Sequence, residues 1–462
     1  MPTHPTARAP RRRNRPSRPP AAQPAAPAFD FEPVDAPPAD TTFEALGVPA
    51  PIVAALNRAG CPTPFPIQAA TLPSSLAGRD VLGRARTGSG KTVAFAVPTV
   101  VALAASTTSR VPNRPRALVL VPTRELAAQV AATTRPIAQA MGLRVAVIHG
   151  GVSQSPQVAA LRAGVDVLIA CPGRLEDLAQ QGHCRLGAVE VCVLDEADHL
   201  ADLGFLPAVK RILDQTPAGG QRMLFSATLD KAVEALVGRY LTNPVMHSVD
   251  SVDATPPDLE HHAFSVTAAD KAAVVRELAS GKERSLLFTR TKHAAKKLAK
   301  DLSARGIPAV DLHGNLSQPQ RDRNLAAFHD GTARVLVATD IAARGIHVDD
   351  VALVVHVDPP TEHKAYLHRS GRTARAGAKG TVVTVILPDQ ARDVATMVRQ
   401  AGIRPLATRI GPGAPETVAL TGPFAEPVSV PAPAAVAPPP ARRPGSGSRR
   451  PASRSGGRRR GR

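Results

Sequence analysis

Residues 81–92, VLGRARTGSGKT, constrain the fold of this chain more than any other stretch. They begin with apolar residues typical of the end of a buried strand. A loop of small residues with two glycines follows (85–90), and Lys91-Thr92 opens an apolar run typical of a packed helix. Strand, glycine-rich loop and helix in this order form the context of a phosphate-binding loop. The sequence therefore predicts a nucleotide site in an α/β fold, although Ala85 replaces the usual first glycine.

Each residue type in this loop has a use in binding phosphates. Gly88 and Gly90 let backbone N–H groups curl around phosphate oxygens. Lys91 supplies a point charge at the β- and γ-phosphates, and the Thr92 hydroxyl is suited to reach Mg²⁺. A loop that merely happens to be rich in glycine is the alternative, and the flanking strand and helix argue against it.

A proline-rich stretch, CPTPFPIQ, precedes the loop and ends at Gln68. Its prolines make the chain rigid and would hold Gln68 at a fixed place beside the phosphate loop. A Gln amide offers both a donor and an acceptor, which is what discrimination of an adenine edge requires. Taken alone, a Gln at this place is more often a helix-start residue, and that alternative stays open.

From residue 81 onward, apolar β-branched runs alternate with helical stretches. Five further strands are predicted, at 117–122, 145–150, 165–170, 189–195 and 223–227. Nearly continuous hydrophobic strands separated by helices indicate a parallel sheet that is covered on both faces, and ligands bind at the carboxyl ends of such strands. The short polar motifs of the chain follow these strands: PTRELAAQ, CPGR, DEAD and SAT.

Asp195 to Asp198, the DEAD motif, carries the second chemical signal. An acid that ends a buried strand near a phosphate loop can hold Mg²⁺ directly or through water. Glu196 is then placed to accept a proton from an attacking water. Acids near a helix start also serve as structural caps, but the neighbouring phosphate loop disfavours that reading here.

A second α/β pattern follows residues 248–260, which lose periodicity and are predicted to form a linker. It has five expected strands but no phosphate loop, at 285–291, 308–314, 333–340, 352–358 and 380–387. It carries the arginine-rich segment HRSGRTARAG at 368–377. Such a segment is usually a solvated surface. Arg372 and Arg375 would supply charge to a transferring γ-phosphate only if the two domains close on one nucleotide.

Charge and composition bound what the chain can do. Of 462 residues, 43% are hydrophobic, which is enough for full cores. The formal net charge of +19 gathers at the ends, because residues 1–28 hold six Arg and no acid and residues 404–462 hold eleven Arg against two Glu. Such tails attract polyanions in a salt-dependent way, unless they are only solubilising linkers.

Several classes are disfavoured by the same reading. No apolar run approaches the roughly 20 residues of a membrane span, and the N-terminus lacks the apolar region of a secretory signal. The four cysteines form no C-x-x-C pair and no metal-ligand spacing. We therefore expect reduced thiols, no zinc site, no membrane partner and a cytoplasmic location.

Together these motifs make residues 41–405 resemble the DEAD-box ATP-dependent RNA helicases, and the Arg-rich tail is similar to the bacterial RhlE-type branch. The resemblance rests on Phe43 with GCPTPFPIQ, ARTGSGKT, PTRELAAQ, HGG, CPGR, DEAD, SAT, LLFTRT, HGNLSQPQR, VATDIAARG and HRSGRTARAG. It implies two tandem RecA-like domains with parallel sheets, flanked by disordered basic tails. The expected division is tail 1–40, ATP-binding domain 41–247, linker 248–260, second domain 261–405 and tail 406–462.

The resemblance also implies a role for each motif residue. The ATP site would comprise Phe43, Gln68, Arg86, Thr87, Gly88, Ser89, Gly90, Lys91 and Thr92, with Phe43 and Gln68 at adenine. Catalysis would use Lys91, Asp195, Glu196 and the arginine fingers Arg372 and Arg375, with Mg²⁺ held by Thr92 and Asp195, partly through water. RNA would be gripped by Pro122, Thr123, Arg124, Gly151, Gly173, Arg174, Gln318, Arg321 and Thr339. Coupling of hydrolysis to RNA binding would use Asp198, Ser226, Thr228 and His368.

Contacts of this kind go to phosphates and 2′-OH groups, so the implied partner is single-stranded RNA or a short duplex, with low sequence specificity. The sequence departs from the family pattern at Phe65, Arg86, Cys171, His347 and Ala374. An RNA clamp or annealing chaperone dominated by the basic tails is the alternative function, and a DNA translocase on the same core is a third. A ribosomal precursor and the RNA-degradation machinery are the expected cellular partners.

Overall fold

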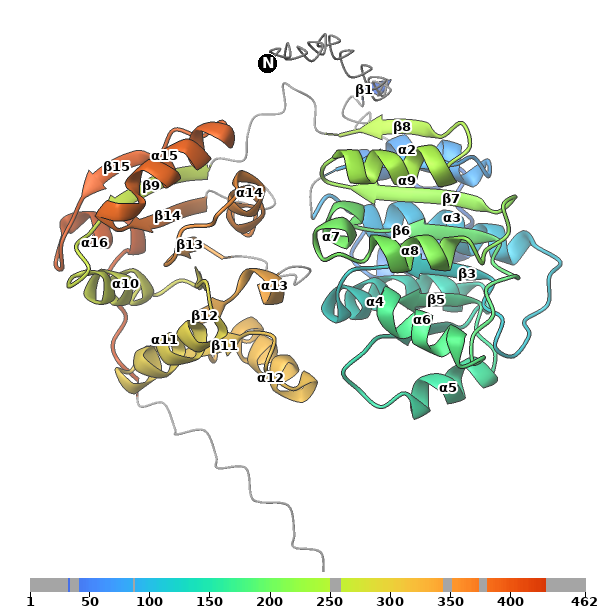
Figure 1. The fold of residues 1–462 in the computed structure, drawn as a ribbon. Helices are drawn as coiled ribbons and strands as arrows, with labels where there is room; N and C mark the ends of the chain where they lie inside the picture. The colour runs from blue at the N-terminus through green and yellow to red at the C-terminus, as the bar shows by residue number, and fades with distance from the viewer. Residues whose placement is uncertain are drawn as a thin grey trace, which may run out of the picture.

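The computed structural model describes residues 41–85, 88–249, 259–343, 351–373 and 380–428, together with the strand Glu32–Pro33. They form two α/β domains that face each other (Figure 1). Each is a parallel sheet with helices on both faces, as the sequence predicted.

Domain 1 holds the phosphate loop between β2 and α3. Its strands are β1 (Glu32–Pro33), β2 (Val81–Arg84), β3 (Ala117–Leu120), β4 (Val145–Ile148), β5 (Val167–Ala170), β6 (Val191–Leu194), β7 (Gln221–Ser226) and β8 (Val245–Ser248). Its helices are α1 (Ala50–Arg58), α2 (Pro66–Leu76), α3 (Lys91–Ala105), α4 (Arg124–Ala140), α5 (Ser155–Arg162), α6 (Pro172–Gln180), α7 (Ala197–Asp202), α8 (Leu206–Leu213) and α9 (Lys231–Tyr240).

The strand order of this eight-stranded sheet is β1-β8-β2-β7-β6-β3-β5-β4. Because all these pairs are parallel, the loops after β2, β7, β6 and β3 emerge side by side at one edge. Those loops are the phosphate loop and the SAT, DEAD and PTRE motifs, so the order of strands assembles the predicted site.

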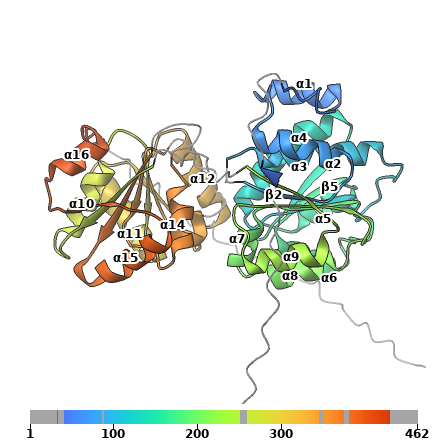
Figure 2. The same ribbon diagram turned by 90° about the horizontal axis from the view of Figure 1, so that it is seen from above.

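Both faces of this sheet are buried. Along β3, Ala117 and Val119 belong to one hydrophobic cluster, whereas Leu118 and Leu120 belong to another. Figure 2 shows α2, α3 and α4 over one face and α6, α8 and α9 over the other. Each fully buried Val or Leu contributes about 1.5–3 kcal/mol, so the edge that carries the motifs is rigidly supported.

Domain 2 repeats the architecture with strand order β11-β12-β10-β13-β14-β9-β15. Its strands are β9 (Leu259–Ser265), β10 (Ser285–Phe288), β11 (Ala309–Leu312), β12 (Val335–Ala338), β13 (Leu353–His356), β14 (Gly380–Ile386) and β15 (Leu406–Arg409). Its helices are α10 (Lys271–Ala279), α11 (Lys292–Ala304), α12 (Gln318–His329), α13 (Asp340–Ala343), α14 (His363–Ser370), α15 (Ala391–Gln400) and α16 (Pro415–Thr421), and the 3₁₀ turn Pro388–Gln390 precedes α15.

The structure differs from the expected boundaries in three places. Residues 406–428 belong to domain 2 rather than to a tail, because β15 pairs with β9 and Ala425 N–H donates to the Ser280 carbonyl. Strands β8 and β9 shorten the expected linker at both ends. Within the expected N-terminal tail, β1 pairs with β8. The remaining predictions for the tails and linker lie outside the described residues. No described helix has both the length and the apolar character to cross a membrane.

Candidate functional site

The phosphate loop has the backbone that its glycines predict. Gly88 and Gly90 adopt φ values of 89° and 85°, in the left-handed region that glycine tolerates best. A Cβ at Gly90 would overlap the Gln68 amide. Lys91 is 7% exposed, and its Nζ donates to the Ala85 carbonyl at 2.8 Å. The lysine charge is therefore held inside the curve of the loop. Ser89 and Thr92 follow the same curve and are partly buried.

Gln68 connects the proline-rich turn to this loop. Its Oε1 accepts from the Phe65 N–H at 2.9 Å, and its Nε2 donates to the Gly90 carbonyl at 3.0 Å. Gln68 is also the third residue of α2, so the helix-start interpretation describes it, whereas its contact with adenine stays a prediction. Arg86 and Thr87, predicted for the same site, lie outside the described residues.

Phe43 differs from its expected place. Its side chain has no exposed surface and lies in the hydrophobic cluster that also contains Ile67, the neighbour of Gln68. Phe43 is therefore a core residue in this structure, and its side chain has no exposed surface for the expected contact with adenine. The family resemblance pointed to Phe43, but the sequence did not show that its side chain is fully buried.

The first two acids of the DEAD motif, Asp195 and Glu196, lie buried beside Lys91. Asp195 accepts the Glu196 N–H at 2.9 Å, and burial raises the pKa of its carboxyl against the opposing charge of Lys91. Burial alone would raise the pKa of Glu196 as well. The bond to His199 Nδ1, at 2.5 Å, and the charges of His199, Lys91 and Arg372 outweigh it and lower that pKa. Glu196 is therefore the charged member of the pair.

Asp198, Ser226 and Thr228 form one hydrogen-bonded unit, and their role in coupling hydrolysis to RNA stays a prediction. Asp198 Oδ2 accepts from both the N–H and the hydroxyl of Thr228, each at 3.0 Å. Ser226 Oγ donates to the Thr228 carbonyl at 2.7 Å and accepts from the Asp198 N–H at 3.3 Å. The carboxyl ends of β6 and β7 are thus tied together, and a shift of one motif must move the other.

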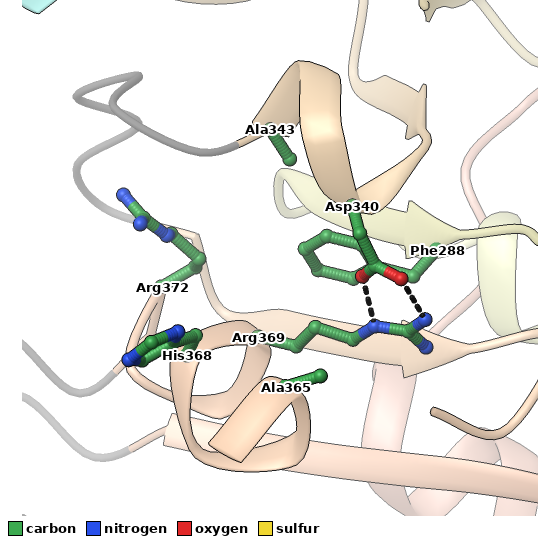
Figure 3. Close-up of a pocket in the computed structure, with 7 residues that line it drawn as sticks. All are labelled: Phe288, Asp340, Ala343, Ala365, His368, Arg369 and Arg372. Atoms are coloured by element: carbon green, nitrogen blue, oxygen red, sulfur yellow. Dashed lines mark hydrogen bonds and ion pairs between the residues drawn. The ribbon is translucent and has the colours of Figure 1, made fainter. Parts of the chain in front are cut away.

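Domain 2 contributes to this site through α14. The His368 ring meets the His199 ring edge-on, with centroids 4.8 Å apart. Arg372 is 4% exposed and close enough to Glu196 to lower its pKa. Figure 3 shows that Arg372 and Arg369 point in different directions. Arg369 instead binds both Asp340 oxygens, at 2.5 and 2.7 Å, and is structural. Arg375 lies outside the described residues.

The predicted RNA residues of the two domains meet each other. Arg124 donates to the Gln318 amide oxygen at 3.0 Å. Arg321 donates to Glu125 at 2.7 Å, and both side chains are at most 10% exposed. Sequence reasoning missed Glu125, although it stands inside the PTRE motif, because its partner is 196 residues away.

The other predicted RNA residues line the same edge in domain 1. Thr123 caps α4 by accepting from the Leu126 N–H, and Pro122 before it is buried. Arg174 donates to the Val152 carbonyl at 3.3 Å. Gly151 and Gly173 are exposed, and a side chain at Gly151 would overlap Arg124. In domain 2, Thr339 directly follows β12.

A second ion pair joins the domains outside the predicted motifs. Lys364 of α14 donates to Asp230 Oδ2 at 2.9 Å, and the two side chains are 34% and 25% exposed. Asp230 also caps α9 by accepting from the N–H groups of Ala232 and Val233. The bond to Asp230 raises the pKa of Lys364. The described domains therefore touch through polar and charged side chains at several separate places.

The comparisons decide the family. Residues 65–236 match the family described as DEAD/DEAH box helicase, and residues 270–377 match the helicase conserved C-terminal domain. The chain belongs to the DEAD/DEAH box helicase family. The ATP-dependent RNA helicase RhlB of Shigella flexneri is 38% identical over 369 residues, which cover 79% of this chain and 88% of that protein. The family resemblance is thereby confirmed, whereas the RhlE-type branch is not.

Two further similar proteins show how much of this chain and of its relatives the similarity covers. The chloroplastic DEAD-box ATP-dependent RNA helicase 3B of Zea mays is 40% identical, covering 77% of this chain and 49% of that helicase. The chain thus spans about half the length of such plant relatives. Dbp5 of S. cerevisiae, solved bound to RNA and ADP BeF3, has a TM-score of 0.69 at 26% identity. That match covers 80% of this chain and 95% of the Dbp5 chain and confirms the tandem RecA-like fold.

Proposed function

We propose that this chain is an RNA-dependent ATPase that separates short RNA duplexes or remodels RNA–protein complexes. One observation carries the proposal: His199 and the buried Glu196 of domain 1 lie against His368 and Arg372 of domain 2, respectively. A site completed by two domains is formed only when they close, so ATP and RNA that both favour closure must favour each other's binding. RhlB and Dbp5, by their descriptions, are RNA-linked relatives of the same build.

The residues present fit ATP with Mg²⁺. The left-handed glycines and Lys91 form a cradle for phosphates. The buried Asp195 carboxyl, ionised when a cation binds, and the Thr92 hydroxyl would provide the oxygen ligands that Mg²⁺ prefers. When bound, Mg²⁺ would neutralise the charge that develops on the phosphates. Glu196, charged at neutral pH, would accept the proton of the attacking water. Arg372 would stabilise the negative charge of the transition state from the other domain.

Arg124, Gln318 and Arg321, with Thr123, Gly151, Gly173, Arg174 and Thr339, would contact the RNA backbone. Their partners are phosphates and 2′-OH groups, so sequence preference would be low. The clamp or annealing alternative is not favoured, because the family matches lie in the two domains and not in the basic tails. A ribosomal precursor or the degradation machinery as partner, and the cytoplasm as location, stay predictions.

The deciding experiment is ATP hydrolysis by the full chain, with and without single-stranded RNA and a DNA of the same sequence. We expect strong stimulation by RNA only. Glu196→Gln should lower turnover by about 10²–10⁴-fold while ATP and RNA still bind, since it removes a base but not the shape of the site. Lys91→Ala should abolish turnover. The control is Glu283→Gln, at an exposed carboxylate just before β10, at the amino end of the domain 2 sheet. Full activity of either site variant would contradict the assigned roles, and equal rates with RNA and DNA would contradict the substrate.

A further inference from the structure

The outer face of α11 is a continuous row of cations. Lys292, His293, Lys296, Lys297 and Lys300 are all exposed, whereas Ala295, Ala299 and Leu302 of the same helix are buried. At 1.5 Å rise per residue, Lys292 and Lys300 are about 12 Å apart along the axis, with Lys296 between them on the same side. We name these five residues the α11 basic face.

The α11 basic face destabilises its own helix. Positive side chains in the first turn oppose the helix dipole, and α11 has no acid there to compensate. Lys296 also stands four residues from both Lys292 and Lys300, and like charges at that spacing cost roughly 0.2–0.5 kcal/mol per pair. The acid that follows, Asp301, already binds Arg305 and Arg276. Lys296, Lys297 and Lys300 have no carboxylate partner within the described parts of the chain. A bound polyanion would remove both penalties.

The position of this face indicates which polyanion. Helix α11 follows β10, at the carboxyl edge of the domain 2 sheet. Lys292 Nζ donates to Asn315 Oδ1 at 3.1 Å. Three residues later Gln318 opens α12 and bonds Arg124 of domain 1. The basic face therefore starts beside the proposed RNA-gripping residues and leads away from them along domain 2. Figure 1 shows α11 next to β11 and β12, on the side of α12 that is turned from domain 1.

We propose that the α11 basic face is an accessory binding surface for the phosphate backbone of RNA that extends beyond the cleft between the domains. This rests on the proposed function. The face holds four lysines and a histidine but no arginine, which suits point-charge contacts to phosphates without base readout. It would retain a substrate near the cleft while one strand is released, independently of sequence.

The test is binding of two single-stranded RNAs, about 6 and about 24 nucleotides long, chosen against the roughly 4–16 nucleotides that single-strand sites cover. The variant combines Lys296→Gln, Lys297→Gln and Lys300→Gln in the full chain. The matched control combines Lys282→Gln, Arg392→Gln and Arg399→Gln, which remove the same charge from other exposed positions of domain 2. Glutamine keeps the helix propensity of lysine, so α11 should still fold.

With wild type, we expect the long RNA to bind more tightly than the short one. In the α11 variant this ratio should fall by up to about 100-fold near 0.1 M salt, and the salt slope for long RNA should flatten by about 2, since each phosphate contact on a single strand contributes roughly 0.7. The thermal midpoint of the unbound variant should not fall, because like-charge repulsion has been removed.

Three results would overturn the inference. The α11 variant and the control lose affinity equally, which would mean a general charge effect. The ratio of long to short binding stays at the wild-type value. Polyglutamate binds the wild type more tightly than RNA does and does not bind the α11 variant, which would make the partner an acidic protein. If the wild type binds neither RNA, the proposed function fails, a result distinct from failure of this surface.

Discussion

The ion pair between Lys364 and Asp230 offers a direct measure of how strongly the two domains hold each other. It joins α14 of domain 2 to the first turn of α9 and touches no residue assigned to ATP or RNA. Because both side chains are about a quarter to a third exposed, water screens the pair, and we expect a coupling of about 1 kcal/mol rather than the value of a buried pair. That corresponds to roughly fivefold in an equilibrium constant.

The perturbation is Lys364→Gln, Asp230→Asn and the double variant. Asparagine retains the cap of α9, so the single change at residue 230 removes the charge and leaves the helix intact. The assay is the RNA concentration that gives half-maximal ATPase stimulation. Each single variant should raise it about fivefold, and the double variant should raise it no further, because either change already removes the pair.

The pH dependence gives an internal check. Burial acts to raise the pKa of Asp230, but the bonds from Lys364, Val233 and Ala232 outweigh it and lower that pKa, while Lys364 is shifted upward. The attraction is therefore present above the ordinary Asp pKa and lost only as the pH falls through the lowered one. Between about pH 6 and about pH 9 the coupling should be constant, and it should weaken with salt. Strictly additive effects of the two single variants would refute the reasoning.

Three further outcomes are expected. Gly90→Ala should lower ATP affinity by more than about tenfold in an equilibrium binding assay, because the new Cβ overlaps the Gln68 amide. The control is Gly47→Ala, which has the same positive φ but open space around the new Cβ. It should cost only about 1–2 kcal/mol of stability. Thr228→Val removes a hydroxyl bond to the Asp198 carboxylate and should cost about 1.5–3 kcal/mol, read as a lower thermal midpoint of domain 1; an unchanged midpoint would mean that the bond contributes nothing. Burial holds the pKa of His356 well below its usual value, so the free energy of unfolding should fall by about 1.4 kcal/mol per pH unit below about pH 6.5, and His356→Gln should flatten that slope in urea titrations.

The sequence was sufficient to predict those features that depend on a local pattern of residues. The central strands of both sheets were predicted from apolar runs, whereas β1, β8, β9 and β15 were not. The phosphate loop was predicted from glycines at fixed spacing, because backbone conformation and burial are encoded near each residue. Gln68 was placed beside the loop for the same reason: a chain of prolines leaves few alternatives.

What the sequence could not supply depends on distant partners. Glu125 and Arg321 are 196 residues apart, and Asp230 and Lys364 are 134 apart, so no local periodicity connects them. Residues 406–409 have the composition of a tail, and only the vacant edge of β9 makes them a strand. Phe43 shows the opposite failure, since the motif was found but its burial was not.

Among the described residues, the contacts between the domains are ion pairs, hydrogen bonds to the Gln318 amide and the edge-on pair of histidine rings. Glu125 and Arg321, which bury each other when the domains are together, return to water when they part. Such a pair makes the closed arrangement specific in geometry yet adds little net adhesion, because hydration of the separated charges nearly balances their attraction. We therefore expect the two domains to separate at a low cost in free energy. An apolar interface of the same area would cost more free energy to separate, because its surface would return to water without a compensating gain in hydration.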